Sequence, residues 1–460
     1  MTDAAAVEGA EARGAGAPAG VRAGMLRRAL VPAFRRLMRL YFREVEAAGP
    51  APEPGTGGRV FVGNHVNGLV DPILVITSAA CTISPVAKST LWKIPGLRFL
   101  LDAVDAVPIV RKRDDPTKPR GANEEVFDKV ASALAGGHNI LIFPEGTSHN
   151  EPHLIEMKTG AARMLARAHE NGGRGLTFQA VGLEFEDRDL FRSRALLVHG
   201  PVRRVDDLTG EGADGDAAGA GRDLVAAITR VMQADLSELI VEGETWPEKQ
   251  RIARVAAMLA HDEGHPTLER WNEIGRAVEA ARKALKHGDE ATVTHVGAAI
   301  DGYHALLERA GVSDAEIAAT AARDRPSLVR LGALAPLAAV GAALYALPYQ
   351  LPRFVTKFQR TDADEVSTIK LGVGLLVYPA WAAALVGGGF ALLPAPVAGA
   401  FAVVAIASPF AALAWLDALP EIGRRRRFAA LDASVVAELR GARAEVLRLV
   451  DDARGRVPTT

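Results

Sequence analysis

The sequence GNHVNGLVDP at residues 63–72 decides the fold class, because it directly follows the short β-like run at residues 60–62. Open α/β sheets bind their ligands beyond the carboxyl ends of strands, so a site is expected here. A histidine and a nearby carboxylate are the minimal pair for removing a proton from a hydroxyl, since the carboxylate orients the imidazole and stabilises its charged form. His65 and Asp71 supply this pair and are the candidate catalytic residues.

Both residues also have ordinary structural interpretations. His65 alone is compatible with a core or capping histidine, and Asp71-Pro72 before an apolar run is typical of a helix start with Asp71 as N-cap. Six positions on a regular helix put two residues on different faces. The segment between His65 and Asp71 must therefore be irregular if the two side chains meet.

A second informative stretch, FPEGTS at residues 143–148, follows another β-like run. It supplies the carboxylate of Glu145 and the backbone N–H groups of a turn, which can bind an anion such as phosphate. The two stretches together predict a site that combines a base with a binding turn.

This pair resembles the signature blocks of the glycerol-phosphate and lysophosphatidate acyltransferase superfamily, which read N-H-x4-D and F-P-E-G-T. Here the first block is H-x5-D, one residue longer, as in the branch that includes fungal-type glycerol-3-phosphate acyltransferases. Asn67 and Asp71-Pro72 fit that branch, whereas Gly63-Asn64 and Gly68 do not. VPIVR at residues 107–111 and AVGLEF at residues 180–185 resemble the second and fourth blocks, so the likeness covers residues 55–240.

The resemblance implies roles for further residues. His65 would be the general base and Asp71 its orienting partner, while the acceptor-binding residues would be Asn67, Arg111, Glu145, Gly146, Thr147 and Ser148. Glu145 would either bind the acceptor hydroxyl or fix the loop. Ser148 stands where many members carry arginine, so Lys158 is a further candidate for the phosphate. A solvated charge run remains the alternative for Arg111, and an ordinary first-turn lysine remains the alternative for Lys158.

The activity implied is that of a membrane-bound acyltransferase that transfers a fatty acyl group from acyl-CoA to glycerol-3-phosphate or 1-acylglycerol-3-phosphate. Acyl carrier protein is the alternative donor, and no cofactor or metal is expected. A remodelling acyltransferase acting on another lysolipid and a non-catalytic lipid-binding membrane protein are the competing functions. The net charge of −1 argues against nucleic acid as a partner.

Short β-like runs alternate with helical stretches through residues 50–240, which predicts an α/β acyltransferase domain with a mixed sheet covered by helices. The strands are expected at residues 60–62, 83–87, 106–110, 139–143, 177–184 and 195–198. Before them, residues 1–22 are expected to form a disordered leader. Residues 23–48 are expected to form one amphipathic helix, with its apolar stripe in a membrane interface or, alternatively, docked on its own domain. The single cysteine, Cys81, excludes an internal disulfide, fits a reducing compartment and is expected to be a buried apolar residue.

The second half of the chain is expected to be helical, with an accessory region at residues 241–325, membrane segments at 328–418 and a basic amphipathic tail at 424–460. Residues 331–349, 371–393 and 397–416 are each near the ~20 apolar residues that cross a hydrocarbon core. The last two are predicted to form a hairpin, and the first to be re-entrant or interfacial. Four arginines at residues 424–427 then indicate a cytoplasmic end, which predicts a cytoplasmic-membrane protein with its catalytic domain facing the cytoplasm.

Overall fold

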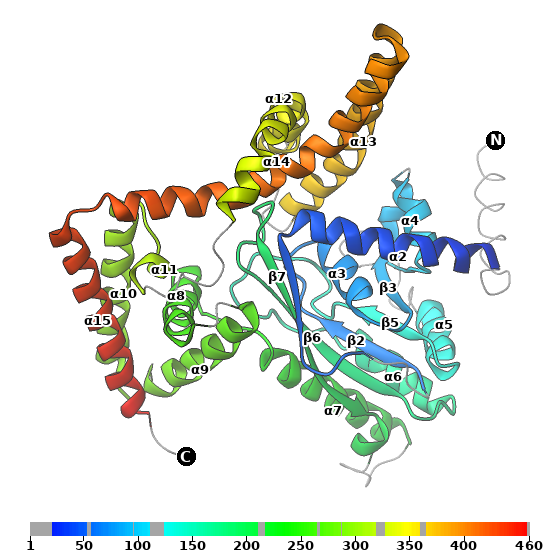
Figure 1. Ribbon diagram of the computed structural model, residues 1–460. Coiled ribbons are helices and arrows are strands. Elements are labelled where there is room, and N and C mark those ends of the chain that lie inside the picture. The colour runs from blue at the N-terminus through cyan, green and yellow to red at the C-terminus, as the bar shows by residue number, and fades with distance from the viewer. Residues whose placement is uncertain are drawn as a thin grey trace.

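A mixed sheet flanked by helices forms the first half of the protein, as the computed structural model shows (Figure 1). The structure describes residues 21–52, 57–94, 96–110, 124–209, 217–264, 267–286, 288–318, 327–358 and 365–457. The strand order is β1-β7-β6-β2-β5-β3-β4, and every neighbouring pair is parallel except β6 and β7. The strands are β1 Glu44–Ala48, β2 Arg59–Gly63, β3 Ile83–Lys88, β4 Val107–Ile109, β5 Asn139–Ile142, β6 Thr177–Phe185 and β7 Arg194–Arg204. The predicted mixed α/β sheet is confirmed.

Strand β1 corrects the prediction of one helix through residues 23–48. Helix α2 ends at Tyr41, and the chain then pairs with β7 as an edge strand. The side chain of Arg194 holds this strand, because its guanidinium donates to Glu44 and Glu46 at 2.9 and 2.7 Å. Ala48 is buried in the cluster on one face of the sheet, and Val45 packs against the cluster on the other face.

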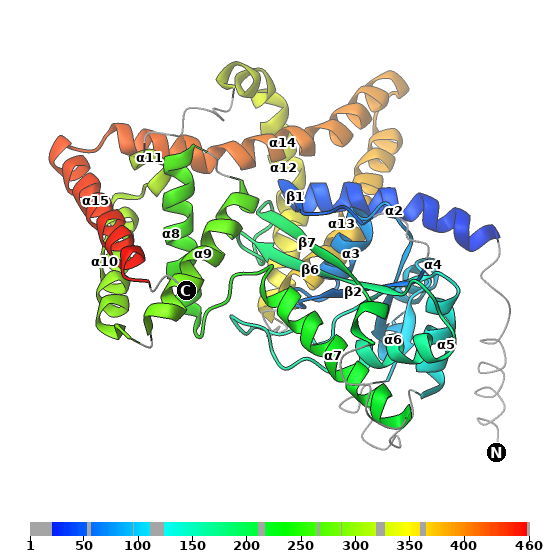
Figure 2. The same ribbon diagram turned by 90° about the horizontal axis from the view of Figure 1, so that it is seen from below.

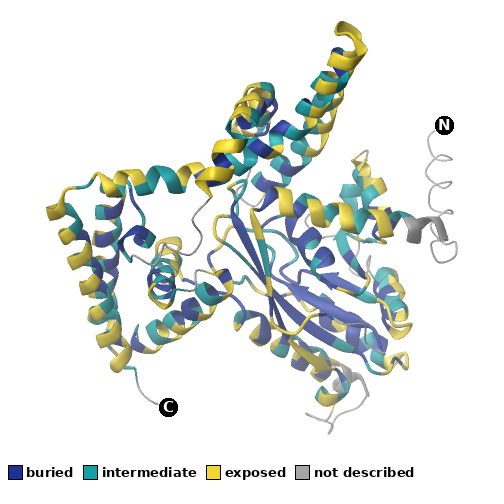
Figure 3. Cartoon of the chain, in the orientation of Figure 1, coloured by how far each residue is buried: buried dark blue, intermediate teal, exposed yellow. Residues whose placement is uncertain are grey.

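Two apolar clusters cover the two faces of the sheet. Helices α5 (Glu124–Ala135), α6 (Gly160–Glu170) and α7 (Ala217–Ser237) lie on the face that receives Val60 and Val62 of β2. Helices α2 (Val21–Tyr41) and α3 (Val70–Ser78) cover the other face, which receives Phe61. This alternation follows from the two-residue period of a strand. Figure 3 shows the sheet as the most continuous buried part of the chain.

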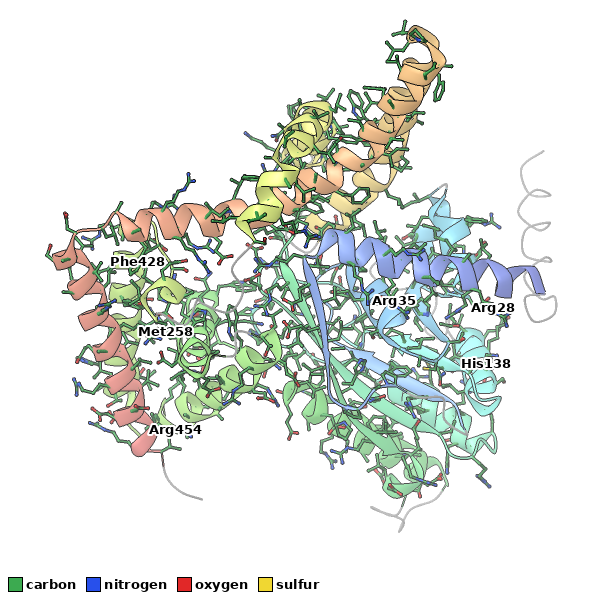
Figure 4. All side chains as sticks on the ribbon, viewed as in Figure 1. Arg28, Arg35, His138, Met258, Phe428 and Arg454 are labelled. Carbon is green, nitrogen blue, oxygen red and sulfur yellow. The ribbon has the colours of Figure 1, made fainter. Side chains whose placement is uncertain are left out.

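Helix α2 packs its apolar stripe on its own domain, as the docked alternative proposed. Met38 and Tyr41 are buried beside α3, and Phe34 and Leu37 pack against the same cluster. This packing favours the docked alternative, while contact of the helix with a membrane interface stays a prediction. The helix still exposes arginines, among them Arg28 and Arg35, which are labelled in Figure 4. The predicted leader lies outside the described residues, apart from residues 21 and 22 at the start of α2.

A helical module follows the sheet in the chain. It contains α8 (Trp246–Glu263), α9 (Leu268–Lys286), α10 (Glu290–Ala310) and α11 (Asp314–Ile317). The C-terminal helix α15 (Ala433–Gly455) returns to pack along α10, so the predicted tail is an integral part of this module. Met258 of α8 is buried in the shared core and Phe428 packs against it (Figure 4).

A buried ion pair joins α15 to α11. The Arg443 guanidinium donates to Asp314 at 2.8 Å, and Asp314 also accepts from the Tyr303 hydroxyl at 2.7 Å. Burial alone would raise the pKa of Asp314, but hydrogen bonds from His261, Arg443 and Tyr303 outweigh it and lower the pKa to about 2. Each partner thus depends on the others, since a buried charge without a partner is strongly destabilising.

Three apolar helices lie between α11 and α15 in the chain: α12 (Leu328–Phe358), α13 (Val366–Leu392) and α14 (Ala395–Ala429). All three are long and apolar enough to cross a membrane, which identifies a membrane protein. Helices α13 and α14 form an antiparallel hairpin whose connecting turn points away from the sheet, and Figure 2 shows α12 running across them. The far end of the hairpin exposes Phe390 and Leu392. This arrangement agrees with the predicted hairpin, while the number of crossings stays a prediction.

Arg192 ties the hairpin to the sheet domain. Its guanidinium binds Asp417 of α14 through two hydrogen bonds of 2.9 and 2.5 Å. The same group donates to the backbone oxygens of Arg39, Leu40 and Phe42 around the end of α2, where helical carbonyl groups lack intrahelical partners. Arg192 has a φ of +69°, a conformation that a non-glycine residue adopts only where its surroundings hold it.

His199 is an unusual residue within the core of the sheet. It lies on β7 opposite Val181, beside a register irregularity, and both buried ring nitrogens lack a hydrogen-bond partner among the residues that the structure describes. Burial disfavours the charged ring and lowers the pKa of His199 to about 4. The folded protein therefore keeps this imidazole neutral across a range in which an unfolded chain protonates it.

We expect this burial to make the domain acid-sensitive. Because the folded-state pKa of His199 is depressed from 6.5 to about 4, its stabilising effect is complete above pH 6.5 and is lost as the pH falls toward 4. His199→Leu removes the titration. The drop in Tm between pH 7 and pH 5, followed in detergent, should be smaller in this variant than in the wild type by about 4–8 °C, which corresponds to roughly 2 kcal/mol.

The exposed His138 provides the matched control, since His138→Gln leaves the buried ring untouched. Equal drops in Tm for wild type and His199→Leu would contradict the prediction.

Candidate active site

The two informative stretches meet because the strands before them are parallel neighbours. Val62 of β2 lies opposite Ile142 of β5, so the loops that follow start side by side at the carboxyl edge of the sheet. The backbone N–H of His65 donates to Glu145 Oε2 at 2.6 Å, which joins the two loops directly. Strands β3 and β4 end at the same edge, where Lys88 closes β3.

His65 and Asp71 form the predicted pair. Asp71 Oδ2 lies 3.0 Å from His65 Nδ1 and also accepts from the backbone N–H groups of Val66 and Asn67 at 2.9 and 2.7 Å. The segment between them is irregular, as their spacing requires, with Gly68 at φ +33°. Asp71 lies in the first turn of α3, whose N-cap is Leu69, so the predicted N-cap position is shifted. Instead of capping its own helix, the carboxylate folds the preceding loop around itself.

The imidazole of His65 is held in one orientation. It stacks on the Phe143 ring, with centroids 4.2 Å apart and planes 16° from parallel. Because a carboxylate only accepts hydrogen bonds, Nδ1 carries the proton of the neutral ring and Nε2 keeps its lone pair. The side chain is 18% exposed, and within the described part of the chain no hydrogen bond occupies Nε2. Nε2 can therefore accept a proton from a bound hydroxyl.

Glu145 is buried between the loops. Its second oxygen, Oε1, lies 2.8 Å from Nε2 of His149, whose backbone N–H donates to the carbonyl oxygen of His65 at 3.1 Å. His149 was not a predicted site residue, and its position four residues after Glu145 is the only sequence signal for this contact. The described residues contain no group of three or more His, Cys, Asp or Glu side chains that could hold a metal ion.

The turn after Glu145 lies under Lys158. Gly146 has a φ of +74°, a conformation that favours glycine, and the Lys158 ammonium group lies where a Cβ of residue 146 would be, although the flexible lysine could move aside. Thr147 and Ser148 are half-buried in the same turn. The structure thus places a cation directly above the backbone of the predicted binding turn.

Asn67 and Arg111 differ from the other predicted binding residues. Asn67 is fully buried and its amide donates to the Arg188 carbonyl at 3.4 Å, so it faces the protein interior. Arg111 lies outside the described residues. The structure brings the other predicted residues together at one edge of the sheet.

Arg188 is a site residue that sequence reasoning missed. Its guanidinium donates to the carbonyl oxygens of Val66 and His149, at 3.1 and 3.4 Å, and to the Asn150 side chain. It also lies 5.7 Å from the centre of the Trp246 ring at the start of α8. A single cation therefore spans the loops after β2 and β5, although nothing in the local sequence around Arg188 indicates this role.

Residues 44–183 match the model of the acyltransferase family, so this part of the chain is similar to that family. The match begins with β1 and ends within β6, so it contains both loops of the site.

Glycerol-3-phosphate O-acyltransferase 2 from Saccharomyces cerevisiae is 37% identical over 90 residues, which is 19% of this chain and 12% of that protein. A lysophospholipid acyltransferase from Arabidopsis thaliana is 34% identical over 119 residues, 25% of this chain and 28% of the relative. The 1-acyl-sn-glycerol-3-phosphate acyltransferase of Borreliella burgdorferi is 28% identical over 111 residues, 24% of this chain and 42% of the relative. Each match spans less than half of the relative.

Among solved structures, the 1-acyl-sn-glycerophosphate acyltransferase from Thermotoga maritima is similar to this chain with a TM-score of 0.32 and 17% identity. The similarity covers 46% of this chain and 81% of that structure.

Proposed function

We propose that this protein transfers a fatty acyl group from acyl-CoA to a hydroxyl of glycerol-3-phosphate or 1-acylglycerol-3-phosphate. The observation that carries the proposal is the His65–Asp71 pair, whose free Nε2 lies at the edge of a domain similar to the acyltransferase family. A base fixed by a carboxylate suits the removal of a proton from an alcohol.

In the proposed reaction, His65 Nε2 takes the hydroxyl proton while the hydroxyl oxygen attacks the thioester carbonyl. Asp71 holds Nδ1–H and stabilises the imidazolium that forms. The new C–O bond completes the ester when the C–S bond breaks. The imidazolium then returns its proton to the departing thiolate, which leaves as free CoA. No metal or other cofactor takes part in this scheme.

The turn at Gly146 and the Lys158 ammonium are the proposed phosphate site, with Arg111 as a second cation. Thr147 and Ser148 supply further polar groups in that turn. Both oxygens of Glu145 are engaged, one by His65 and one by His149, which supports a role in fixing the loop over direct contact with the acceptor hydroxyl.

The membrane helices support a lipid substrate, since a long acyl chain and a lysolipid both partition into a bilayer. We propose that the α13–α14 hairpin enters the cytoplasmic membrane, with the sheet domain on the cytoplasmic side. Arg424 to Arg427 at the end of α14 support this orientation. Acyl carrier protein is the alternative donor.

A second candidate function is acylation of another lysolipid. The similarity to the lysophospholipid acyltransferase of Arabidopsis thaliana favours it, over a longer segment than the match to the yeast enzyme. Such an acceptor carries a phosphodiester instead of the phosphomonoester that Lys158 and Arg111 would bind.

Thiol release from long-chain acyl-CoA by the purified protein tests the proposal. Glycerol-3-phosphate, 1-acylglycerol-3-phosphate and lysophosphatidylethanolamine are offered separately in phospholipid nanodiscs. Turnover with either phosphomonoester supports the proposal, whereas turnover with lysophosphatidylethanolamine alone supports the second candidate. Folded protein that releases thiol with none of these acceptors, from acyl-CoA or acyl carrier protein, overturns both.

Lys158→Ala and Arg111→Ala are each expected to raise KM for the phosphomonoester about tenfold with a smaller change in kcat, because these residues would bind a part of the acceptor that does not react. Lys129→Ala, an exposed lysine on α5 that pairs with Glu125, is the matched control. Unchanged KM in both site variants would remove the phosphate role and favour the lysolipid acceptor.

A further inference from the structure

The first turn of α13 is bonded to the loop that carries His65, although the two lie about three hundred residues apart in the chain. Ser367 is fully buried and donates through Oγ to the carbonyl oxygen of Arg188 at 2.6 Å. Lys370 donates to the carbonyl oxygen of Asp189 at 2.5 Å, and Leu371 is buried in the cluster around α2 and α3. A helix that otherwise exposes apolar residues thus begins with a polar contact inside the sheet domain.

Thr368 makes the most direct of these contacts. Its Oγ1 accepts from the backbone N–H of Leu69, the N-cap residue of α3, at 2.8 Å. N–H groups at the start of a helix have no partner within the helix and need an acceptor from elsewhere. Leu69 lies two residues before Asp71, so Thr368 holds the same loop that Asp71 folds around its carboxylate.

Arg188 completes the connection. Its carbonyl oxygen receives the Ser367 hydroxyl, and its guanidinium donates to the carbonyl oxygen of Val66, the residue after His65. Each end of the loop is therefore attached to α13, at Leu69 directly and at Val66 through Arg188. The loop has its own supports as well, in Asp71 and Glu145.

We propose that Ser367 and Thr368 are positioning residues, through which the membrane hairpin sets the orientation of His65 relative to the bound acceptor. This inference rests on the proposed acyltransferase function. Neither side chain would touch substrate; both act through the loop of residues 65–71. Helix α13 would then serve as part of the active-site scaffold as well as a membrane segment.

Thr368→Val tests the proposal, because valine keeps the shape of threonine and removes the acceptor for Leu69 N–H. In full-length protein in nanodiscs, kcat should fall about tenfold, while KM for donor and acceptor stays within twofold, since misorientation of a base slows the chemical step without removing a binding contact. Thr368→Ser retains a hydroxyl and should restore most of kcat.

Thr356→Val is the matched control. Thr356 lies on α12, and within the described part of the chain its Oγ1 donates only to backbone oxygens one turn earlier in the same helix, those of Pro352 and Arg353. This variant should keep kcat within twofold of the wild type. A Thr368→Val variant that matches the control, or that changes KM alone, would overturn the proposal.

Hydrogen exchange gives a readout that needs no turnover. Peptides that cover residues 64–75 should exchange faster in Thr368→Val than in the wild type, and Thr356→Val should not differ. If Thr368→Val exchanges faster but the wild type acylates no acceptor, the contact is supported and the acyltransferase function is refuted. If the wild type turns over and Thr368→Val changes neither exchange nor kcat, the acyltransferase function is supported and the positioning role is refuted.

Discussion

Replacement of His65 by alanine is expected to lower kcat for acyl transfer about 10³- to 10⁴-fold. General-base catalysis by a positioned histidine contributes about 10²- to 10⁴-fold, and no other base among the described residues lies beside Asp71 at this sheet edge. Thiol release with the preferred acceptor measures the effect. KM should change little, because the imidazole acts on the hydroxyl proton during the chemical step.

Two further variants make this result interpretable. His65→Gln fills more of the space beside the Phe143 ring and should be as inactive as His65→Ala, which separates loss of the base from loss of packing. His153→Ala changes an exposed histidine in the neighbouring loop and should leave kcat unchanged. Residual activity above one tenth of the wild type in both His65 variants would contradict the mechanism.

The same variant tests the non-catalytic interpretation. His65→Ala should bind phospholipid vesicles as well as the wild type, since the membrane helices do not involve His65. A wild type without turnover, combined with weaker vesicle binding by His65→Ala, would instead indicate a lipid-binding role.

Asp71→Asn is expected to lower kcat about 10³-fold. The amide retains an oxygen that can accept from the backbone N–H groups of Val66 and Asn67, so the loop can keep its shape. It loses the negative charge that stabilises the imidazolium and the fixed preference for a proton on Nδ1. The variant therefore isolates the orienting role of the carboxylate from its structural role.

Steady-state kinetics and hydrogen exchange together measure this prediction. Exchange in peptides covering residues 64–75 should match the wild type while kcat collapses. Asp71→Ala, which removes the loop contacts too, should accelerate exchange as well as abolish turnover. A kcat for Asp71→Asn within threefold of the wild type would show that the pair has no catalytic role.

The sequence predicted the parts of the fold that depend on local patterns. The strands β2, β3, β5 and β6 stand close to their predicted positions because each is a short β-like run between helical stretches. Strand β1 was missed because EVEAA at residues 44–48 continues the helical stripe and is rich in good helix formers. Pairing with β7 and the ion pairs to Arg194 override that local preference.

The site residues also divide into those that the sequence indicates and those that depend on distant contacts. His65 and Asp71 were predicted mainly because the stretches around them resemble the signature blocks of a known family, and the structure brings their side chains together. The contacts of Glu145, Arg188 and Thr368 join residues roughly 80, 120 and 300 positions apart in the chain, and no local pattern indicates such pairings. The sequence also left open which surface the apolar stripe of α2 contacts, since such a stripe suits a protein core and a lipid surface alike.

The return of α15 to the helical module constrains the order in which the protein can be completed. Asp314 is synthesised long before Arg443, and the membrane hairpin lies between them in the chain. Until α15 leaves the ribosome, the carboxylate of Asp314 lacks its guanidinium partner, and α10 lacks the helix that covers it. The module can therefore close only after the hairpin has been made, so a completed core shows that synthesis has passed both the hairpin and α15.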